Sequence, residues 1–187
     1  MAKDKINLPI IGLAGPDCFN SMRALVKIIY ALSILLLAAY LALPSAEFPA
    51  PPPNSLLSQE PADTESVYRR AYYTNYSREE IMNHYKSVFN IAMLQIRLNY
   101  PPEEAYTLIR DQTRSSWLEE LVHPGRESLF VNGFYPTKPT EQININGVHY
   151  INKITVHLFP SRFPSRFTVL GLLIVSFYWL KKEYAKI

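Results

Sequence analysis

The sequence predicts an α+β protein in which two transmembrane helices flank a small two-layer domain with a mainly antiparallel sheet. Three observations lead to this prediction. Two strongly apolar runs lie towards the ends of the 187-residue chain, a more polar middle separates them, and strand-like and helix-like patterns alternate in that middle. A chain of this length has room for one domain of ordinary size with attachments.

The first apolar run, residues 28–43, contains no charged side chain. With the four residues before it, the run reaches about 20 residues, enough to cross roughly 30 Å of hydrocarbon as a helix. We therefore expect a cytoplasmic segment over residues 1–23 and a transmembrane helix over 24–43. A signal peptide cleaved near Ala46 is the alternative, although Pro44 stands where the cleavage pattern requires a small residue.

The second apolar run, residues 167–180, is short for a membrane span. Pro164 suits the first turn of a helix, however, and a helix over 164–184 would be about 31 Å long. We expect a second transmembrane helix there, with a short cytoplasmic tail to residue 187; a buried helix of a soluble protein is the alternative. The residues expected at the membrane interface are Arg162, Arg166, Tyr178, Trp179, Lys181 and Lys182.

The stretch FPSRFPSRF, residues 159–167, contains the four-residue unit FPSR twice in succession and ends with a third Phe. We interpret residues 159–166 as an interfacial collar. Its aromatic rings would dip toward acyl chains, while Arg162 and Arg166 would meet lipid phosphates. A chance duplication in a linker is the alternative.

The basic residues near the two runs indicate their orientation. Few of them lie on the side of the connecting region, where Arg162 and Arg166 stand, and more lie on the outer flanks. Positive charge favours the cytoplasm, so we expect both termini there and the middle of the chain on the outer side of a plasma membrane. The outer-flank residues are Lys3, Lys5, Arg23, Lys27, Lys181, Lys182 and Lys186.

The middle of the chain begins with a proline-rich segment, residues 44–65, which we expect to be an extended spacer. The folded domain is expected over 66–158. A strand over 67–74 precedes a helix that begins after Ser77, where Glu80 completes a capping box.

A second strand over 93–100 is followed by a second helix that opens with Pro101 and Pro102. We expect Ala105, Leu108 and Ile109 to form the buried stripe of this helix.

Residues 115–122 fit either a strand or a third helix, and we favour the strand because it pairs well with the next segment, 127–136. Asn146-Gly147 predicts a hairpin, followed by a last strand over 148–159. The expected arrangement places two helices, or three, on one face of the sheet.

Composition excludes several classes of function. The net charge of +3 is small and scattered, which argues against nucleic-acid binding. Cys18 is the single cysteine, so neither an intrachain disulfide nor a cysteine-based zinc site can form. No phosphate-binding loop, nucleophile elbow or metal-binding motif occurs, so we assign no catalytic residue, cofactor or metal ligand.

These features favour a non-enzymatic accessory or scaffold subunit of an envelope protein complex, with the lipid bilayer and a membrane or envelope protein as partners. Tyr72, Tyr73 and Tyr76 are the candidate contact residues, since exposed tyrosines suit protein binding. A module that binds envelope glycan or lipid through the same tyrosines and the collar is the alternative.

A hydrolase that uses Glu119 or Glu120 with His123 is the less favoured reading. A strand would put one of the two glutamates on the core side, with Arg114 or Arg126 as the nearest partner in sequence. A structural ion pair, or a helix that exposes both glutamates, is the favoured explanation.

Overall fold

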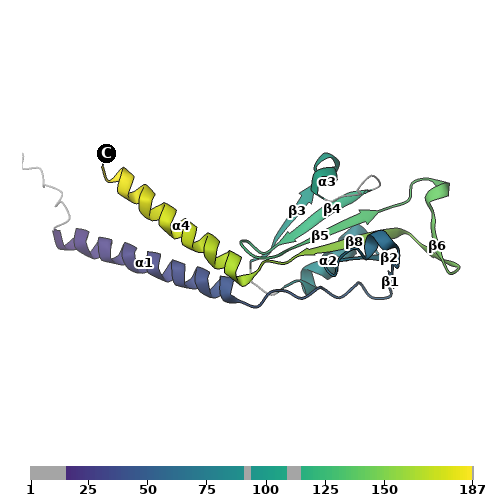
Figure 1. The fold of residues 1–187 in the computed structure, drawn as a ribbon, viewed down its shortest axis with the longest axis horizontal. Helices are drawn as coiled ribbons and strands as arrows, with labels where there is room; N and C mark the ends of the chain where they lie inside the picture. Colours follow the sequence, from purple (N-terminus) through teal and green to yellow (C-terminus); the bar gives the residue numbers. More distant parts are fainter. Residues whose placement is uncertain (1–15, 91–93, 109–114, 187) are drawn as a thin grey trace, which may run out of the picture. The chain divides into compact units, whose positions relative to one another are not determined.

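The computed structural model describes residues 16–90, 94–108 and 115–186. The chain divides into two compact units, Met1–Tyr40 and Leu41–Ile187, and each is described by itself. The described part of the first unit is helix α1, Pro16–Ala42, whose last two residues belong to the second unit. The second unit holds the sheet, its covering helices and helix α4, Phe163–Tyr184 (Figure 1).

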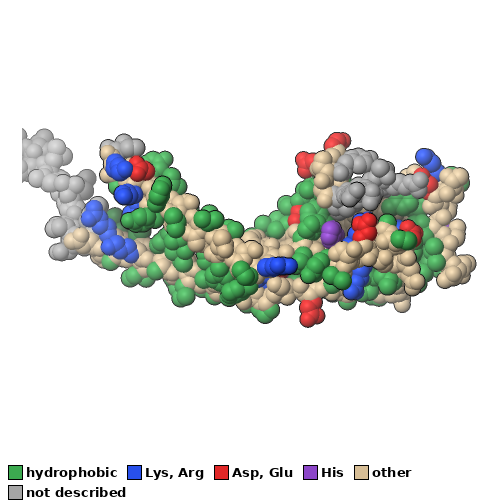
Figure 2. Space-filling model, viewed as in Figure 1, with side chains coloured by type: hydrophobic (Ala, Val, Ile, Leu, Met, Phe, Trp, Pro, Cys, Tyr) green, Lys and Arg blue, Asp and Glu red, His purple; other side chains and the backbone are tan. Residues whose placement is uncertain are grey.

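Helices α1 and α4 are each long enough and apolar enough to cross a bilayer. In α1 the apolar stretch covers Asn20–Ala42, and in α4 it covers the whole helix. Hydrophobic side chains lie along both (Figure 2). The helices predicted from the two apolar runs are therefore present in the structure, and Pro164 stands in the first turn of α4, as expected.

The centre of the second unit is a six-stranded antiparallel sheet with the strand order β1-β2-β8-β5-β4-β3. A separate two-stranded ribbon pairs β6 with β7. The overall α+β class with a mainly antiparallel sheet is thus confirmed. The strands are β1 Leu56–Leu57, β2 Arg69–Thr74, β3 Ile96–Tyr100, β4 Trp117–Val122, β5 Ser128–Phe134, β6 Ile143–Ile145, β7 Val148–Tyr150 and β8 Asn152–Phe159.

The ambiguous segment 115–122 forms a strand, β4, which pairs with β5 on one side and β3 on the other. The tight turn to β5 passes through Gly125, whose φ of +71° favours glycine. The backbone N–H of Arg126 donates to the carbonyl of His123 across this turn. Pairing along two neighbours therefore outweighs the helical pattern of the same residues.

Helix α2, Arg78–Val88, begins with the predicted capping box. The Ser77 hydroxyl accepts from the backbone N–H of Glu80, and the Glu80 carboxylate accepts from the backbone N–H of Ser77. Ile81 and Tyr85 are fully buried against the sheet. The main core lies between this helix and the sheet, and its buried members are Ala46, Tyr72, Ile81, Met82, Tyr85, Phe89, Trp117, Leu121, Leu129, Val131, Ile154, Val156 and Leu158.

The second helix, α3 (Pro102–Leu108), lies on the opposite face of the sheet from α2. Its Ala105 packs with Leu118 and Phe130, whose side chains alternate with those that face α2. The expectation that both helices cover one face was wrong. Leu108 is 40% exposed rather than buried, and Ile109 lies outside the described residues.

The predicted Asn146-Gly147 hairpin is confirmed. Both residues have positive φ, 52° and 81°, as a two-residue turn of this kind requires. The last strand, however, is not continuous over 148–159, because it divides at Ile151 into β7 and β8, which belong to different sheets.

Residues 44–65 pack against the domain, in contrast to the extended spacer expected from their prolines. Strand β1 pairs with β2, and a short 3-10 helix, Pro61–Asp63, follows it. Ala46 is buried and Phe48 packs against the main core. The prolines stiffen this segment, but its apolar and small polar residues attach it to the sheet.

Candidate functional site

The Glu119 side chain points from β4 toward the α2 side of the sheet, between Trp117 and Leu121, and is 1% exposed. The Arg78 Nε donates to Glu119 Oε1 at 2.5 Å, and the Arg97 Nε donates to the other carboxylate oxygen. These partners come from α2 and β3, whereas Arg126 pairs with Glu127, and Arg114 lies outside the described residues.

The two arginines keep Glu119 ionised. Burial by itself would raise the pKa of Glu119, but the hydrogen bonds and charges of Arg97 and Arg78 lower it below its ordinary value. Both carboxylate oxygens are occupied. This is the arrangement of an ion pair that joins α2, β3 and β4, in line with the structural interpretation of the buried glutamate.

Glu120 points to the other face of the sheet and accepts a hydrogen bond from the Tyr100 hydroxyl. Burial and the neighbouring Glu120 raise the pKa of Tyr100 to about 12, so this phenol stays protonated and acts as a donor. The two adjacent glutamates therefore serve opposite faces and have no partner in common.

His123 is fully buried and stacks on Phe89 with ring centroids 4.5 Å apart. Its Nδ1 lies 3.3 Å from Oε1 of Glu127, a residue that the sequence reasoning did not single out. Along β4, His123 and Glu119 are four residues apart, about 13 Å in an extended strand. The structure thus does not bring Glu119, Glu120 and His123 together.

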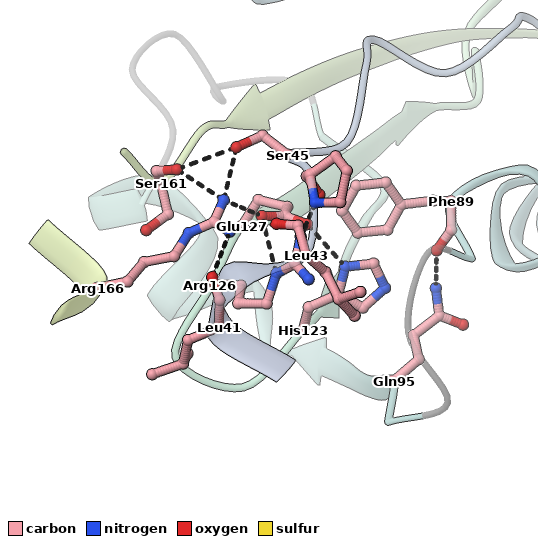
Figure 3. Close-up of polar contacts among 11 residues, drawn as sticks. Leu41, Leu43, Ser45, Phe89, Gln95, His123, Arg126, Glu127, Ser161 and Arg166 are labelled. Carbon is pink, nitrogen blue, oxygen red and sulfur yellow. Dashed lines mark hydrogen bonds and ion pairs between the residues drawn. The ribbon is translucent and has the colours of Figure 1, made fainter. Parts of the chain in front are cut away.

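Glu127 is the centre of a second buried ion cluster, formed with Arg126 and Arg166 (Figure 3). The Arg126 Nη2 donates to Glu127 Oε1 at 2.9 Å, and the Arg166 Nη2 donates to Oε2 at 2.9 Å. Burial alone would raise the pKa of Glu127, but the contact with His123 and the two guanidinium charges lower it below its ordinary value.

Arg166 comes from the first turns of α4, yet it is 3% exposed. Its Nη1 donates to the carbonyl oxygens of Leu41 and Leu43 at 3.2 and 3.0 Å. Its Nη2 also donates to the Ser45 hydroxyl and to the Ser161 carbonyl oxygen. The guanidinium therefore satisfies carbonyls left open where α1 ends, a requirement of every helix terminus.

The position of Arg166 differs from the expected contact with lipid phosphates. Sequence reasoning grouped it with Arg162 because both follow Ser in the repeated unit. Once the helix begins at Phe163, however, Arg166 falls one turn inside it and faces Glu127, which is 39 residues away in sequence. No local signal marks such a pairing.

The other residues expected at the membrane interface are exposed in the structure. Arg162 lies just before α4, and Tyr178 and Trp179 are 65% and 69% exposed near its far end. Lys181 and Lys182 occupy the last turn. These side chains are free to reach a bilayer surface, and the contact itself stays a prediction.

Of the three tyrosines expected to contact a partner, two are buried and Tyr76 is half-buried. Tyr72 and Tyr73 are 3% and 6% exposed, and Tyr76 packs against the main core. The Tyr73 hydroxyl donates to Glu60 Oε1 at 2.5 Å, which fastens the segment before β2 to the sheet. Period-two alternation alone could not reveal this, because α2 covers the Tyr72 face of β2 while residues 58–63 cover the Tyr73 face.

A polar cavity of about 440 Å³ opens on the sheet face that α2 does not cover. Its floor comes from β2, β5 and β8, and its walls come from the 3-10 helix Pro61–Asp63 and the segment around β6. Lys153 lies in the floor and bonds Asp63 Oδ2 at 2.7 Å and Glu60 Oε2 at 2.9 Å. Sequence reasoning did not find this cavity, because its lining residues come from six separate segments.

Within residues 16–90, 94–108 and 115–186, no group of three or more His, Cys, Asp or Glu side chains could hold a metal ion. His84 instead hydrogen-bonds to the carbonyl oxygen of Ala50, and His149 to the side chain of Asn144. No protein-family model, curated protein or solved structure matches this chain, so its function has to be argued from its own geometry.

Proposed function

We propose that this chain is a non-enzymatic accessory or scaffold subunit of an envelope protein complex, anchored in the plasma membrane by α1 and α4. Both termini would lie in the cytoplasm, and the sheet domain would lie outside. The apolar lengths of the two helices support the anchor, and the basic residues on their outer flanks support the orientation.

The buried cluster around Glu127 supports a scaffold rather than a loosely tethered domain. It joins the start of α4 through Arg166, the β4–β5 turn through Arg126, and the residues that follow α1 through the Leu43 carbonyl. Arg126 also donates to the Pro44 carbonyl oxygen at 2.5 Å. A domain joined in this way to the start of α4 would present its surface to a membrane partner in a defined position relative to that helix.

The observation that carries the partner role is the open edge of the sheet at β3. In the strand order, β3 is the last member, and within the described residues no strand pairs with its outer side. The opposite edge, β1, is only two residues long, whereas β3 has five. Ile96 and Leu98 on β3 are 45% and 39% exposed.

Natural proteins normally shorten, cover or charge such an edge, because its backbone N–H and C=O groups attract another strand. The occupant that fits this edge is an extended segment of a partner membrane protein, added as a further strand. This surface replaces the three tyrosines as the proposed contact.

The test compares two double variants of the full chain, purified from membranes in mild detergent. I96K/L98K places lysines on the β3 edge, and V67K/V148K places them at other exposed apolar positions, 75% and 50% exposed. We expect native mass measurements to show one defined hetero-complex for the wild type and for V67K/V148K, and its loss for I96K/L98K.

A monomer in all three samples would contradict the proposal. A mass of two copies of this chain would also contradict it, because the edge would then serve self-association. A hetero-complex that survives I96K/L98K would remove β3 as the contact surface.

A further inference from the structure

We propose that the polar cavity on the sheet face opposite α2 binds an uncharged, polyhydroxylated ligand such as a saccharide unit. The cavity volume of about 440 Å³ lies in the range of small-molecule sites, roughly 300–1,000 Å³. The inference concerns a ligand site that is separate from the proposed partner edge at β3.

The pairing register builds the floor of the cavity. Thr155 on β8 stands between Ala71 on β2 and Asn132 on β5, and the small Ala71 leaves room beside them. In the next row of the same face, Lys153 stands between Tyr73 and Phe134. Polar hydrogen-bonding groups thus lie next to the half-buried Phe134 ring, the combination that suits the hydroxyl and C–H faces of a sugar.

The charges that line the cavity balance each other. Lys153 pairs with both Glu60 and Asp63, and Arg69 pairs with Glu65 at 3.4 Å. The hydrogen bond from Tyr73 and the contact with Lys153 lower the pKa of Glu60, so this carboxylate is ionised at neutral pH. Because Lys153, Glu60 and Asp63 already satisfy one another, an added ionic group would lose its hydration without gaining a free counter-charge from these three residues.

The neutral polar groups keep unused hydrogen-bonding capacity. Asn132 accepts a hydrogen bond from the Ser115 hydroxyl through Oδ1, which leaves its NH₂ group for a ligand. The Thr155 hydroxyl makes no hydrogen bond within the described residues. Gln142 and Asn144, in the cavity wall, each use one side of their amide, at Lys138 and His149.

A ligand that satisfies such a mixed set must both donate and accept at neighbouring positions. Hydroxyl groups do this, whereas a carboxylate only accepts and an ammonium only donates. The chemistry of the lining therefore selects an uncharged polyol over an ionic metabolite.

The test is an NMR titration of the full ¹⁵N-labelled chain in a polyoxyethylene detergent, which carries no sugar headgroup. The probes are glucose, N-acetylglucosamine and cellobiose, with glucuronate and glucosamine as charged analogues. We expect saturable shifts at Asn132, Thr155, Gln142 and Asn144 with at least one neutral sugar, and about tenfold weaker binding of both charged analogues. Comparison of the affinities for cellobiose and glucose tells whether the cavity binds a sugar chain or a single sugar unit.

T155V keeps the shape of the side chain and removes its hydroxyl, and we expect it to weaken the sugar affinity about tenfold. T107V, at an exposed position on α3, is the matched control and should leave the affinity unchanged. If T155V does not fold, Q142A/N144A at two exposed wall positions provides the same comparison. Absence of saturation by all three neutral sugars, or equal binding of a charged analogue, would overturn the proposal.

Discussion

At the scale of single residues, the most consequential contact is the ion pair between Glu127 and Arg166. Both side chains are almost completely removed from solvent, with exposures of 0% and 1%. Burying a charge costs several kcal/mol unless partners compensate for it. Here the guanidinium has carbonyl oxygens and a carboxylate as partners, and the carboxylate has two guanidinium groups and a histidine.

Removal of the Glu127 charge should therefore be costly. We expect Glu127→Gln to lower the free energy of unfolding by about 3–5 kcal/mol, because Arg126 and Arg166 would stay buried without a counter-charge. Glu183→Gln is the matched control: its carboxylate pairs with Lys186 on the surface of α4, and its loss should cost less than about 1 kcal/mol. Denaturant unfolding in detergent micelles measures both, and equal values would contradict the role given to the cluster.

Acid should weaken the protein through the same two ion clusters. The pKa values of Glu119 and Glu127 are lowered in the folded chain, so the unfolded chain binds more protons as the pH falls. Their contribution to stability is complete above the unfolded-state pKa of about 4.3 and is lost as the pH drops through the lower folded-state values.

The melting temperature should therefore fall most steeply below about pH 4, and a smaller fall should begin in milder acid, because burial lowers the pKa of His157 and the unfolded chain protonates that residue first. Glu127→Gln should show a shallower fall than the wild type, because one of the two titrating groups is gone. A melting temperature that does not respond to acid would show that neither carboxylate is ionised in the folded state.

At the scale of elements, local sequence signals fix where helices and turns begin. The reciprocal hydrogen bonds of Ser77 and Glu80 start α2, and the positive φ values of Asn146 and Gly147 set the β6–β7 turn. These features depend on residues within four positions of each other, which is why they could be predicted.

The capping box gives a direct test at this scale. We expect Ser77→Ala to lower the free energy of unfolding by about 1 kcal/mol, since the backbone N–H of Glu80 loses its acceptor. Ser87→Ala, in an exposed position near the end of the same helix, is the control and should change stability by less than about 0.5 kcal/mol. Equal losses would indicate that α2 depends on packing alone.

Contacts between distant segments could not be predicted from the sequence. Periodicity shows that Ala105 and Ile81 each belong to an apolar stripe, but it does not say that their helices cover opposite faces. Likewise, the alternation of residues 67–74 predicts that Tyr73 lies on one face of a strand. It does not predict that the proline-rich segment around Glu60 covers that face and buries Tyr73. Each error arose where a side chain's surroundings were set by a segment more than ten residues away.

At the scale of the whole molecule, the second unit combines the sheet domain with helix α4 and with the residues that follow helix α1. The ion cluster at Glu127 makes this junction a packed part of the domain, in place of a flexible linker. A proposed partner edge at β3 and a proposed ligand cavity on the face opposite α2 would then be held at a defined position relative to this junction.

The central claim is that the chain crosses the membrane twice and displays this domain outside, and cysteine accessibility tests it most directly. The chain has one cysteine, Cys18, in the segment before the first apolar run, and Thr137 is an exposed position in the domain. An impermeant maleimide should leave Cys18 unlabelled in intact cells and label it after permeabilisation, whereas C18S/T137C should be labelled in intact cells. Labelling of Cys18 in intact cells, with T137C protected, would contradict the orientation and the function built on it.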